Sequence, residues 1–181
     1  MTRLDLFNEC CRGGYSNTQD YVSWKIIDGI MYFQCSKEKE DWLKNIDCRL
    51  VQSEIGLTHK GFDEAYREVF CMILQNPVTG YCGYSHGAVI AARASAATGK
   101  RATVFGCPNF MYNPTKEILD RFRIVEFVQN KKDIVANGLF WMKKGRTIIM
   151  TIGHATRGLT PLWQWLSGHT PNEYRQRIAN V

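Results

Sequence analysis

The chain has 181 residues, of which 45% are hydrophobic and 22% are charged, and these values predict a single compact, soluble globular domain over residues 1–181. Its net charge of +6 comes from scattered basic clusters without a nucleic-acid motif, which indicates a solvated face with, as the alternative, weak peripheral contact with anionic lipid. No apolar run reaches the roughly 20 residues of a membrane span, and seven cysteines without a C-x-x-C pair fit neither a zinc site nor a disulfide framework.

The N-terminal segment, residues 1–28, carries little hydrophobic pattern. Asp5 and Glu9 stand where a signal peptide would have its apolar core, so we expect no classical export and a cytoplasmic protein with reduced thiols. Residues 15–27 fit a short helix or a strand, and the sequence leaves both open.

Two strands and two helices are expected next. The apolar run Gly29–Ser36 predicts a buried strand, Ser36 is a natural cap for a charged helix over Lys37–Ile46, and Asp47–Ser53 predicts a partly exposed strand. The helical period over Gly61–Leu74 predicts an amphipathic helix packed on a sheet. Its apolar stripe comprises Phe62, Ala65, Tyr66, Val69, Phe70 and Ile73, and its polar face comprises Asp63, Glu64, Arg67 and Glu68.

A match to G-x-S-x-G, Gly83–Gly87, lies between the turn signal Asn76–Gly80 and an Ala-rich segment of high helix propensity. This context is the one that a nucleophile elbow requires, in which a strand turns sharply into a helix and carries a serine at the bend. The two glycines permit the tight turn and close packing of the helix. The alternative is a glycine-rich loop in which Ser85 only caps the helix.

Strands and helices alternate in the rest of the chain. The expected strands are Ala102–Cys107, Arg123–Gln129 and Thr147–Thr151, and the expected helices are Pro114–Phe122, Pro161–Leu166 and Pro171–Ile178. Such alternation predicts the α/β class, with a mostly parallel central sheet and helices on both faces.

Catalytic candidates follow the ends of the expected strands, where an open parallel sheet binds its ligands. A nucleophilic Ser85 needs a base and a carboxylate that orients the base. Asp133 follows the strand ending at Gln129, and His169 lies before the last helix, so that serine, acid and base occur in the order found in α/β-hydrolases.

Each role has rivals. His154 is the rival base, whereas His59 is expected to be structural, and Asp120 and Glu126 are poorer acids because they lie inside predicted elements. Asp133 has the alternative of a solvated loop acid. The oxyanion donors expected are the backbone N–H of His86 and the backbone N–H of Ser36, whose hydroxyl is a further candidate donor beside its role as a helix cap.

Taken together, the segments resemble the class 3 lipases, a branch of the α/β-hydrolases, over roughly residues 30–174. The segments that carry this resemblance are Phe33–Ser36, Asp41–Ile46, Thr58–Phe62, Gly83–Ala88, Val104–Pro108, Val128–Val135, and His169 with Tyr174. The resemblance implies Ser85 as nucleophile, Asp133 as acid, His169 as base, and an oxyanion hole at Ser36 and His86. This sequence departs from the family pattern beside the nucleophile: the family usually has His before and Leu after the serine, whereas this chain has Tyr84 and His86.

The expected function is therefore that of a serine hydrolase, a lipase or esterase that cleaves a small-molecule, lipid or phospholipid ester without metal or organic cofactor. The side chains expected to line an acyl site, or else to pack in the core, are Trp42, Leu43, Phe110, Leu139, Phe140 and Trp141. The alternative function is that of a hydrolase-like fold without turnover that serves as a binding or structural partner protein.

Overall fold

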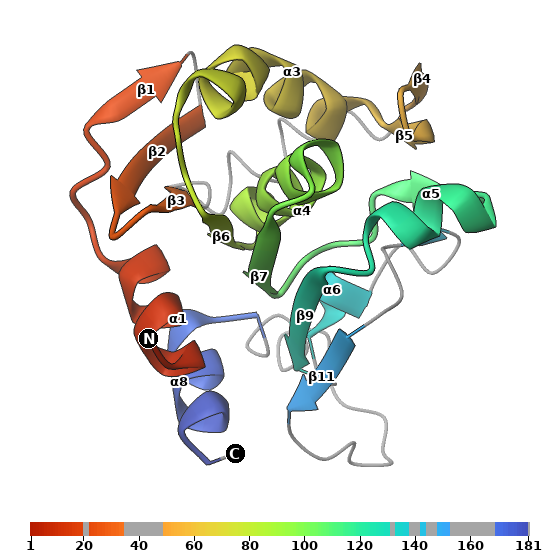
Figure 1. Ribbon diagram of the computed structural model, residues 1–181. Coiled ribbons are helices and arrows are strands. Elements are labelled where there is room, and N and C mark those ends of the chain that lie inside the picture. Colours follow the sequence, from red (N-terminus) through yellow and green to blue (C-terminus); the bar gives the residue numbers. More distant parts are fainter. Residues whose placement is uncertain are drawn as a thin grey trace, which may run out of the picture.

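A mainly parallel sheet forms the centre of the structure, a computed structural model that describes residues 1–19, 22–34, 49–130, 133–137, 142–143, 148–152 and 169–180 (Figure 1). Within these residues, seven strands pair in the order β1 (Asn17–Gln19), β2 (Val22–Ile27), β3 (Ile30–Phe33), β6 (Gly80–Tyr84), β7 (Arg101–Phe105), β9 (Val125–Asn130) and β11 (Ile148–Ile152). The pairs from β3 to β11 are parallel, whereas β1, β2 and β3 pair antiparallel at one edge. The predicted mostly parallel sheet is confirmed.

Helices cover both faces of this sheet. On one side lie α3 (Lys60–Gln75) and α4 (His86–Thr98), and on the other lie α1 (Arg3–Cys11) and α8 (Pro171–Ala179), near the two chain ends (Figure 1). Successive strand residues point to opposite faces. Phe33 and Val104 accordingly pack in the core beneath α3 and α4, and their neighbours Tyr32 and Phe105 pack in a second core with α1 and α8. The α/β class is confirmed.

The weakly patterned N-terminal segment holds α1, β1 and β2. Thr2 and Asp5 form a capping box that starts α1, which buries Phe7 and Cys10. The choice left open for residues 15–27 resolves to strand in the parts described. Four consecutive residues of β2, Val22–Lys25, are buried, and the Lys25 ammonium is bound inside by the Glu9 carboxylate at 2.7 Å. Burial therefore does not alternate along this part of the strand.

A second, antiparallel sheet stands beside the first and was not predicted as such. Its order is β10 (Met142–Lys143), β8 (Met111–Tyr112), β5 (Gly56–His59) and β4 (Leu50–Ser53). The expected strand over Asp47–Ser53 is present as β4, but it pairs with β5. The helices expected over Lys37–Ile46 and Pro161–Leu166 lie outside the described residues.

Two short helices flank β9. Thr115 caps α5 (Lys116–Arg121) by accepting a hydrogen bond from the backbone N–H of Ile118, so Pro114 lies before this helix and not within it. The one-turn helix α6 (Ile134–Asn137) follows β9 directly after Asp133. Among the helices that the structure describes, none has the length and apolar character required to cross a bilayer.

The described cysteines are Cys10, Cys11, Cys71, Cys82 and Cys107, and none of them forms a disulfide with another described residue. Cys10 of α1 and Cys82 of β6 lie with their sulfur atoms 3.2 Å apart in the core between the helix and the strand. Burial raises the pKa of the Cys10 thiol well above its ordinary value. Both side chains therefore act as small apolar groups in the packing of α1 on the sheet.

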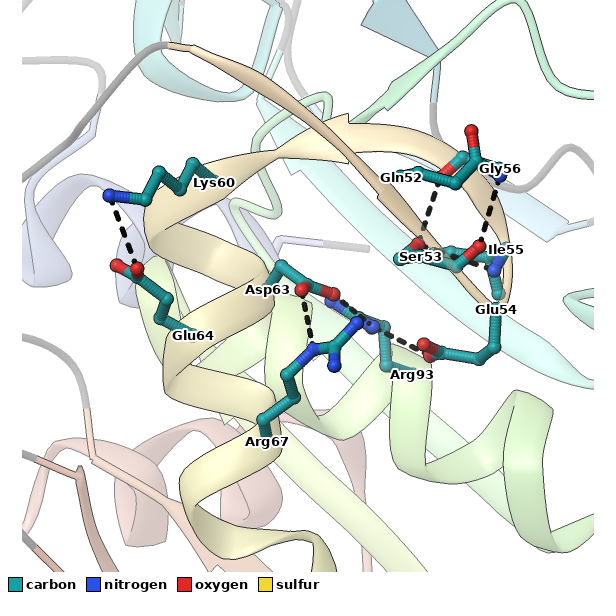
Figure 2. A network of polar contacts seen from close by, with 10 residues as sticks. All are labelled: Gln52, Ser53, Glu54, Ile55, Gly56, Lys60, Asp63, Glu64, Arg67 and Arg93. Carbon is teal, nitrogen blue, oxygen red and sulfur yellow. Dashed lines mark hydrogen bonds and ion pairs between the residues drawn. The ribbon is translucent and has the colours of Figure 1, made fainter.

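The amphipathic pattern of α3 was wrong at two positions. Phe70, predicted in the apolar stripe, is 36% exposed, whereas Asp63, predicted on the polar face, is only 4% exposed. The reason is a buried cation on α4: the Arg93 guanidinium, 1% exposed, lies 2.8 Å from the Asp63 carboxylate (Figure 2). An ion pair across the helix interface thus draws a charged residue into the core.

Arg93 also reaches the turn between β4 and β5, where its guanidinium lies 2.6 Å from the Glu54 carboxylate (Figure 2). Its guanidinium carbon stands 4.1 Å from the centre of the Tyr66 ring. On the solvent side of α3, the exposed Arg67 guanidinium contacts the Asp63 carboxylate at 2.6 Å. One buried side chain therefore joins α3, α4 and the second sheet.

We expect Arg93→Met to lower the free energy of unfolding by about 2–4 kcal/mol, because the Asp63 carboxylate then stays buried and, among the described residues, keeps the exposed Arg67 as its one ion-pair partner. Urea unfolding at neutral pH measures this change. The matched control is Glu64→Gln, which breaks the exposed pair of Glu64 with Lys60 and should cost about 0–1 kcal/mol. Equal losses in the two variants would contradict the structural role of Arg93.

Candidate active site

Ser85 stands at a sharp bend between β6 and α4. It has a positive φ of 57°, which is unusual for a residue other than glycine, and α4 begins at the next residue. Its backbone N–H donates to the Phe105 carbonyl at 3.0 Å, and its own carbonyl accepts from the Ala88 N–H at 3.0 Å. These bonds to β7 and α4 hold the strained backbone that projects the hydroxyl from the turn.

Both glycines of the motif are required by close backbone approach. A Cβ added at Gly83 would lie 2.2 Å from the Gly87 carbonyl oxygen, and one added at Gly87 would lie 2.4 Å from the Phe33 carbonyl oxygen. No side chain fits at such distances. The start of α4 therefore packs directly against the backbone of β3 and β6, as the predicted elbow requires.

The structure brings Ser85, His169 and Asp133 together in one chain of hydrogen bonds. His169 Nε2 lies 2.8 Å from Ser85 Oγ, and His169 Nδ1 lies 2.7 Å from Asp133 Oδ2. An ionised carboxylate only accepts hydrogen bonds, so Nδ1 carries the donated proton and Nε2 is free to accept from the hydroxyl. These contacts join segments that are 84 and 36 residues apart in the sequence.

The Asp133 carboxylate is fully buried and has two further donors. The backbone N–H of Ala136, in α6, donates to Oδ1 at 3.0 Å, and the Tyr174 hydroxyl donates to Oδ2 at 2.7 Å. Burial, with the nearby Asp133 charge, raises the pKa of Tyr174 well above its ordinary value, so the hydroxyl keeps its proton. This carboxylate is therefore fixed in orientation, which argues against the alternative of a solvated loop acid.

Tyr174 was not predicted as a site residue. It lies on α8, five residues after His169, and its hydroxyl also accepts from the Asn130 backbone N–H at 3.2 Å. The sequence signal was its place in the segment with His169 that carried the family resemblance. Its partner, however, is 41 residues away, and no local pattern connects the two.

His86 is the first residue of α4, where backbone N–H groups have no acceptor within the helix. Its ring packs on Phe62, with centroids 5.7 Å apart. Burial, and secondarily His59, lowers the pKa of His86 to about 4, so the imidazole is neutral at physiological pH. Ser36, the other expected oxyanion residue, lies outside the described residues.

We expect His86→Leu to make the protein less sensitive to acid. Because the folded-state pKa of about 4 lies below the ordinary 6.5, the unfolded state binds the proton more tightly, and stability is lost as the pH falls from 6.5 towards 4. At pH 5 this loss is about 2 kcal/mol. Urea unfolding at pH 7 and pH 5 should show that the variant loses less stability than the wild type over this interval. Identical losses would contradict a partly buried, neutral His86.

The other candidates fall in different places. Phe110 is fully buried and packs edge-to-face on Phe122 at 5.6 Å, within the core beneath α3 and α4. The carboxylate of Glu126, a rival acid, forms an ion pair with the Arg3 guanidinium at 2.6 Å. His59 is buried against Phe62, with centroids 4.6 Å apart. Asp120, the other rival acid, is exposed on α5. Outside the described residues lie the rival base His154 and the expected acyl-site residues Trp42, Leu43, Leu139, Phe140 and Trp141.

The arrangement supports nucleophilic chemistry at the Ser85 hydroxyl. The imidazole can take the hydroxyl proton, and the buried carboxylate keeps the imidazole in the required tautomer. Within the part of the chain that the structure describes, no group of three or more His, Cys, Asp or Glu side chains is placed to hold a metal ion.

Solved lipase structures share this architecture. The triacylglyceride lipase of Rhizomucor miehei has a TM-score of 0.58 at 14% identity, over 90% of this chain and 82% of the lipase chain. Lip2 lipase of Yarrowia lipolytica has a TM-score of 0.56 at 15% identity, over 77% and 63% of the two chains. A triacylglycerol lipase whose catalytic centre is formed by a serine protease triad has a TM-score of 0.54 at 17% identity, over 79% and 66%.

At these identities the similarity shows the fold, which is α/β-hydrolase-like. The matched part covers less than two thirds of the Yarrowia lipase and of the triad lipase. No protein-family model matches the chain, and no curated protein sequence matches it.

Proposed function

We propose that this protein is a serine hydrolase that cleaves carboxylic esters through an acyl-enzyme. The observation that carries the proposal is the continuous chain from Ser85 Oγ through the His169 imidazole to Asp133, with contacts of 2.8 and 2.7 Å. The elbow adds support, since its strained Ser85 is held by backbone bonds from two directions. Ser85 acts as nucleophile, His169 as general base and Asp133 as the orienting acid.

The reaction then runs in two halves. Ser85 Oγ attacks the ester carbonyl while its proton passes to His169 Nε2, and Asp133 stabilises the imidazolium that forms. Collapse of the tetrahedral intermediate expels the alcohol, which takes this proton from His169. A water molecule, deprotonated by His169, next attacks the acyl-enzyme carbonyl. The bond to Ser85 Oγ then breaks, the proton passes from His169 back to Ser85 Oγ, and the carboxylic acid leaves.

The negative charge on the tetrahedral oxygen needs donors that are already in place. We assign one to the backbone N–H of His86, because the first N–H groups of a helix have no intrahelical acceptor and lie at the positive end of its dipole. Ser36 is the proposed second donor. The neutral His86 ring adds no charge of its own to this region at neutral pH.

We propose esters of fatty acids as the substrate class, with a phospholipid acyl ester as one member. This proposal is supported by the shared fold with lipases, including two that are named for triacylglyceride or triacylglycerol. A cytoplasmic location and weak peripheral membrane contact remain predictions from the sequence.

A fluorophosphonate probe with intact-mass detection tests the proposal. Such probes phosphonylate an activated serine, so the wild type should gain one adduct, and Ser85→Ala should gain none. An ester panel of increasing acyl length, with mass detection of the released acids, then defines the substrate. Folded wild-type protein that stays unlabelled and hydrolyses no ester would overturn the proposal and favour a binding or structural role.

A further inference from the structure

Tyr84, the residue before Ser85, contacts His169 in two ways. Its hydroxyl donates a hydrogen bond to the backbone carbonyl of His169. Its ring also lies nearly parallel to the imidazole, with centroids 5.2 Å apart and an interplanar angle of 25°. Tyr84 is only 4% exposed, so both contacts are made inside the protein.

Tyr84 is itself held from several sides. Phe7 of α1 packs on its ring edge-to-face at 5.3 Å, and the Tyr174 ring packs at 5.6 Å. Gly106, with φ of 55°, leaves the space that these groups fill, since a Cβ there would lie 3.1 Å from the Tyr84 ring and 3.2 Å from Asp133 Oδ2. The ring of Tyr84 therefore has little room to move.

The two contacts restrict different motions of His169. The bond to the carbonyl fixes the backbone just before α8, and hence the position of the side chain. The ring contact restricts rotation of the imidazole, whose two nitrogens must point at Ser85 and Asp133 at once. Because the side chains of successive strand residues point to opposite faces, a residue on β6 next to the nucleophile reaches His169 from the α1 and α8 side.

We propose that Tyr84 is a positioning residue that sets the place and the plane of the His169 imidazole. This inference rests on the proposed hydrolase function, in which proton transfer from Ser85 to His169 depends on their alignment. Tyr84 acts on the reaction through His169, which it contacts by its hydroxyl and its ring. Its loss should therefore slow the chemical step and leave substrate binding nearly unchanged.

The test compares Tyr84→Phe, which removes only the hydroxyl, with Tyr84→Leu, which also removes the ring. For a short p-nitrophenyl ester we expect kcat to fall about tenfold and about 100-fold, respectively, with KM within about twofold of the wild type. The matched control is Tyr81→Phe, a buried tyrosine on the same strand that faces the opposite core. It should keep the wild-type kcat.

A second measurement does not depend on turnover. The His169 Nδ1 proton, bonded to Asp133, should give a far-downfield proton resonance in the wild type and in Tyr81→Phe, and this resonance should weaken or broaden in the Tyr84 variants. If the wild type has the resonance but no esterase activity, the proposed function fails while the resonance still tests Tyr84. The inference would be overturned if both Tyr84 variants kept the resonance unchanged and, provided that the wild type is active, also kept the kcat of the wild type.

Discussion

Replacing His169 by alanine should lower kcat for a short p-nitrophenyl ester by about 10⁴- to 10⁶-fold, because the Ser85 hydroxyl then has no base to take its proton. The geometry behind this expectation is the 2.8 Å contact between Nε2 and Oγ. KM should change little, since the imidazole contributes mainly to the transition state. Steady-state rates and the rate of fluorophosphonate labelling both measure the effect.

The double variant Ser85→Ala with His169→Ala sharpens this expectation. Once one residue of a catalytic unit is removed, removing a second one costs little further rate. The kcat of the double variant should therefore be within about threefold of that of either single variant. The matched control is His154→Ala, which removes the rival base and should keep wild-type activity. If His154→Ala were inactive and His169→Ala active, the assignment of the base would be wrong.

Gly83→Ala should destabilise the protein by about 3 kcal/mol or more, or prevent folding, because the new methyl group meets backbone atoms that cannot retreat. Its Cβ would lie 2.2 Å from the Gly87 carbonyl oxygen and 2.7 Å from the Ala88 nitrogen. Relief requires α4 to move away from β6, which would also displace Ser85. Thermal and urea unfolding measure the loss.

Gly13→Ala is the matched control for this substitution. No atom of the described residues lies within 4 Å of a Cβ at Gly13, and this residue does not have the positive φ that favours glycine. The control should stay within about 0.5 kcal/mol of the wild type. A Gly83→Ala protein with wild-type stability would show that α4 does not pack on β6 as the structure has it.

Local patterns predicted the elements with the clearest periodicity. A few neighbouring residues are enough to recognise the helical period of α3, the Ala-rich helix α4 and the apolar strands β3, β7 and β9. The motif Gly83–Gly87 identified the elbow because its steric demands are local. The order of strands and helices then led to the correct fold class.

Elements that depend on distant partners were missed or placed wrongly. In the second sheet, β8 and β10 join the hairpin of β4 and β5, which lies more than 50 residues earlier in the sequence. With two residues each, β8 and β10 are too short to show a hydrophobic pattern. Asp63 was placed on the surface because its buried partner, Arg93, lies 30 residues away on another helix. Charge alone predicts exposure, and only the partner reverses it.

By itself, the sequence determined that a serine stands on a strand-to-helix turn in an α/β protein, because glycine sterics and hydrophobic periodicity act over neighbouring residues. Only the tertiary structure decided that His169, Asp133, Tyr84 and Tyr174 meet around this serine. The hydrogen bonds among these four residues and Ser85 span 36 to 85 residues of sequence, and they form when the fold brings the ends of β6 and β9 and the start of α8 together.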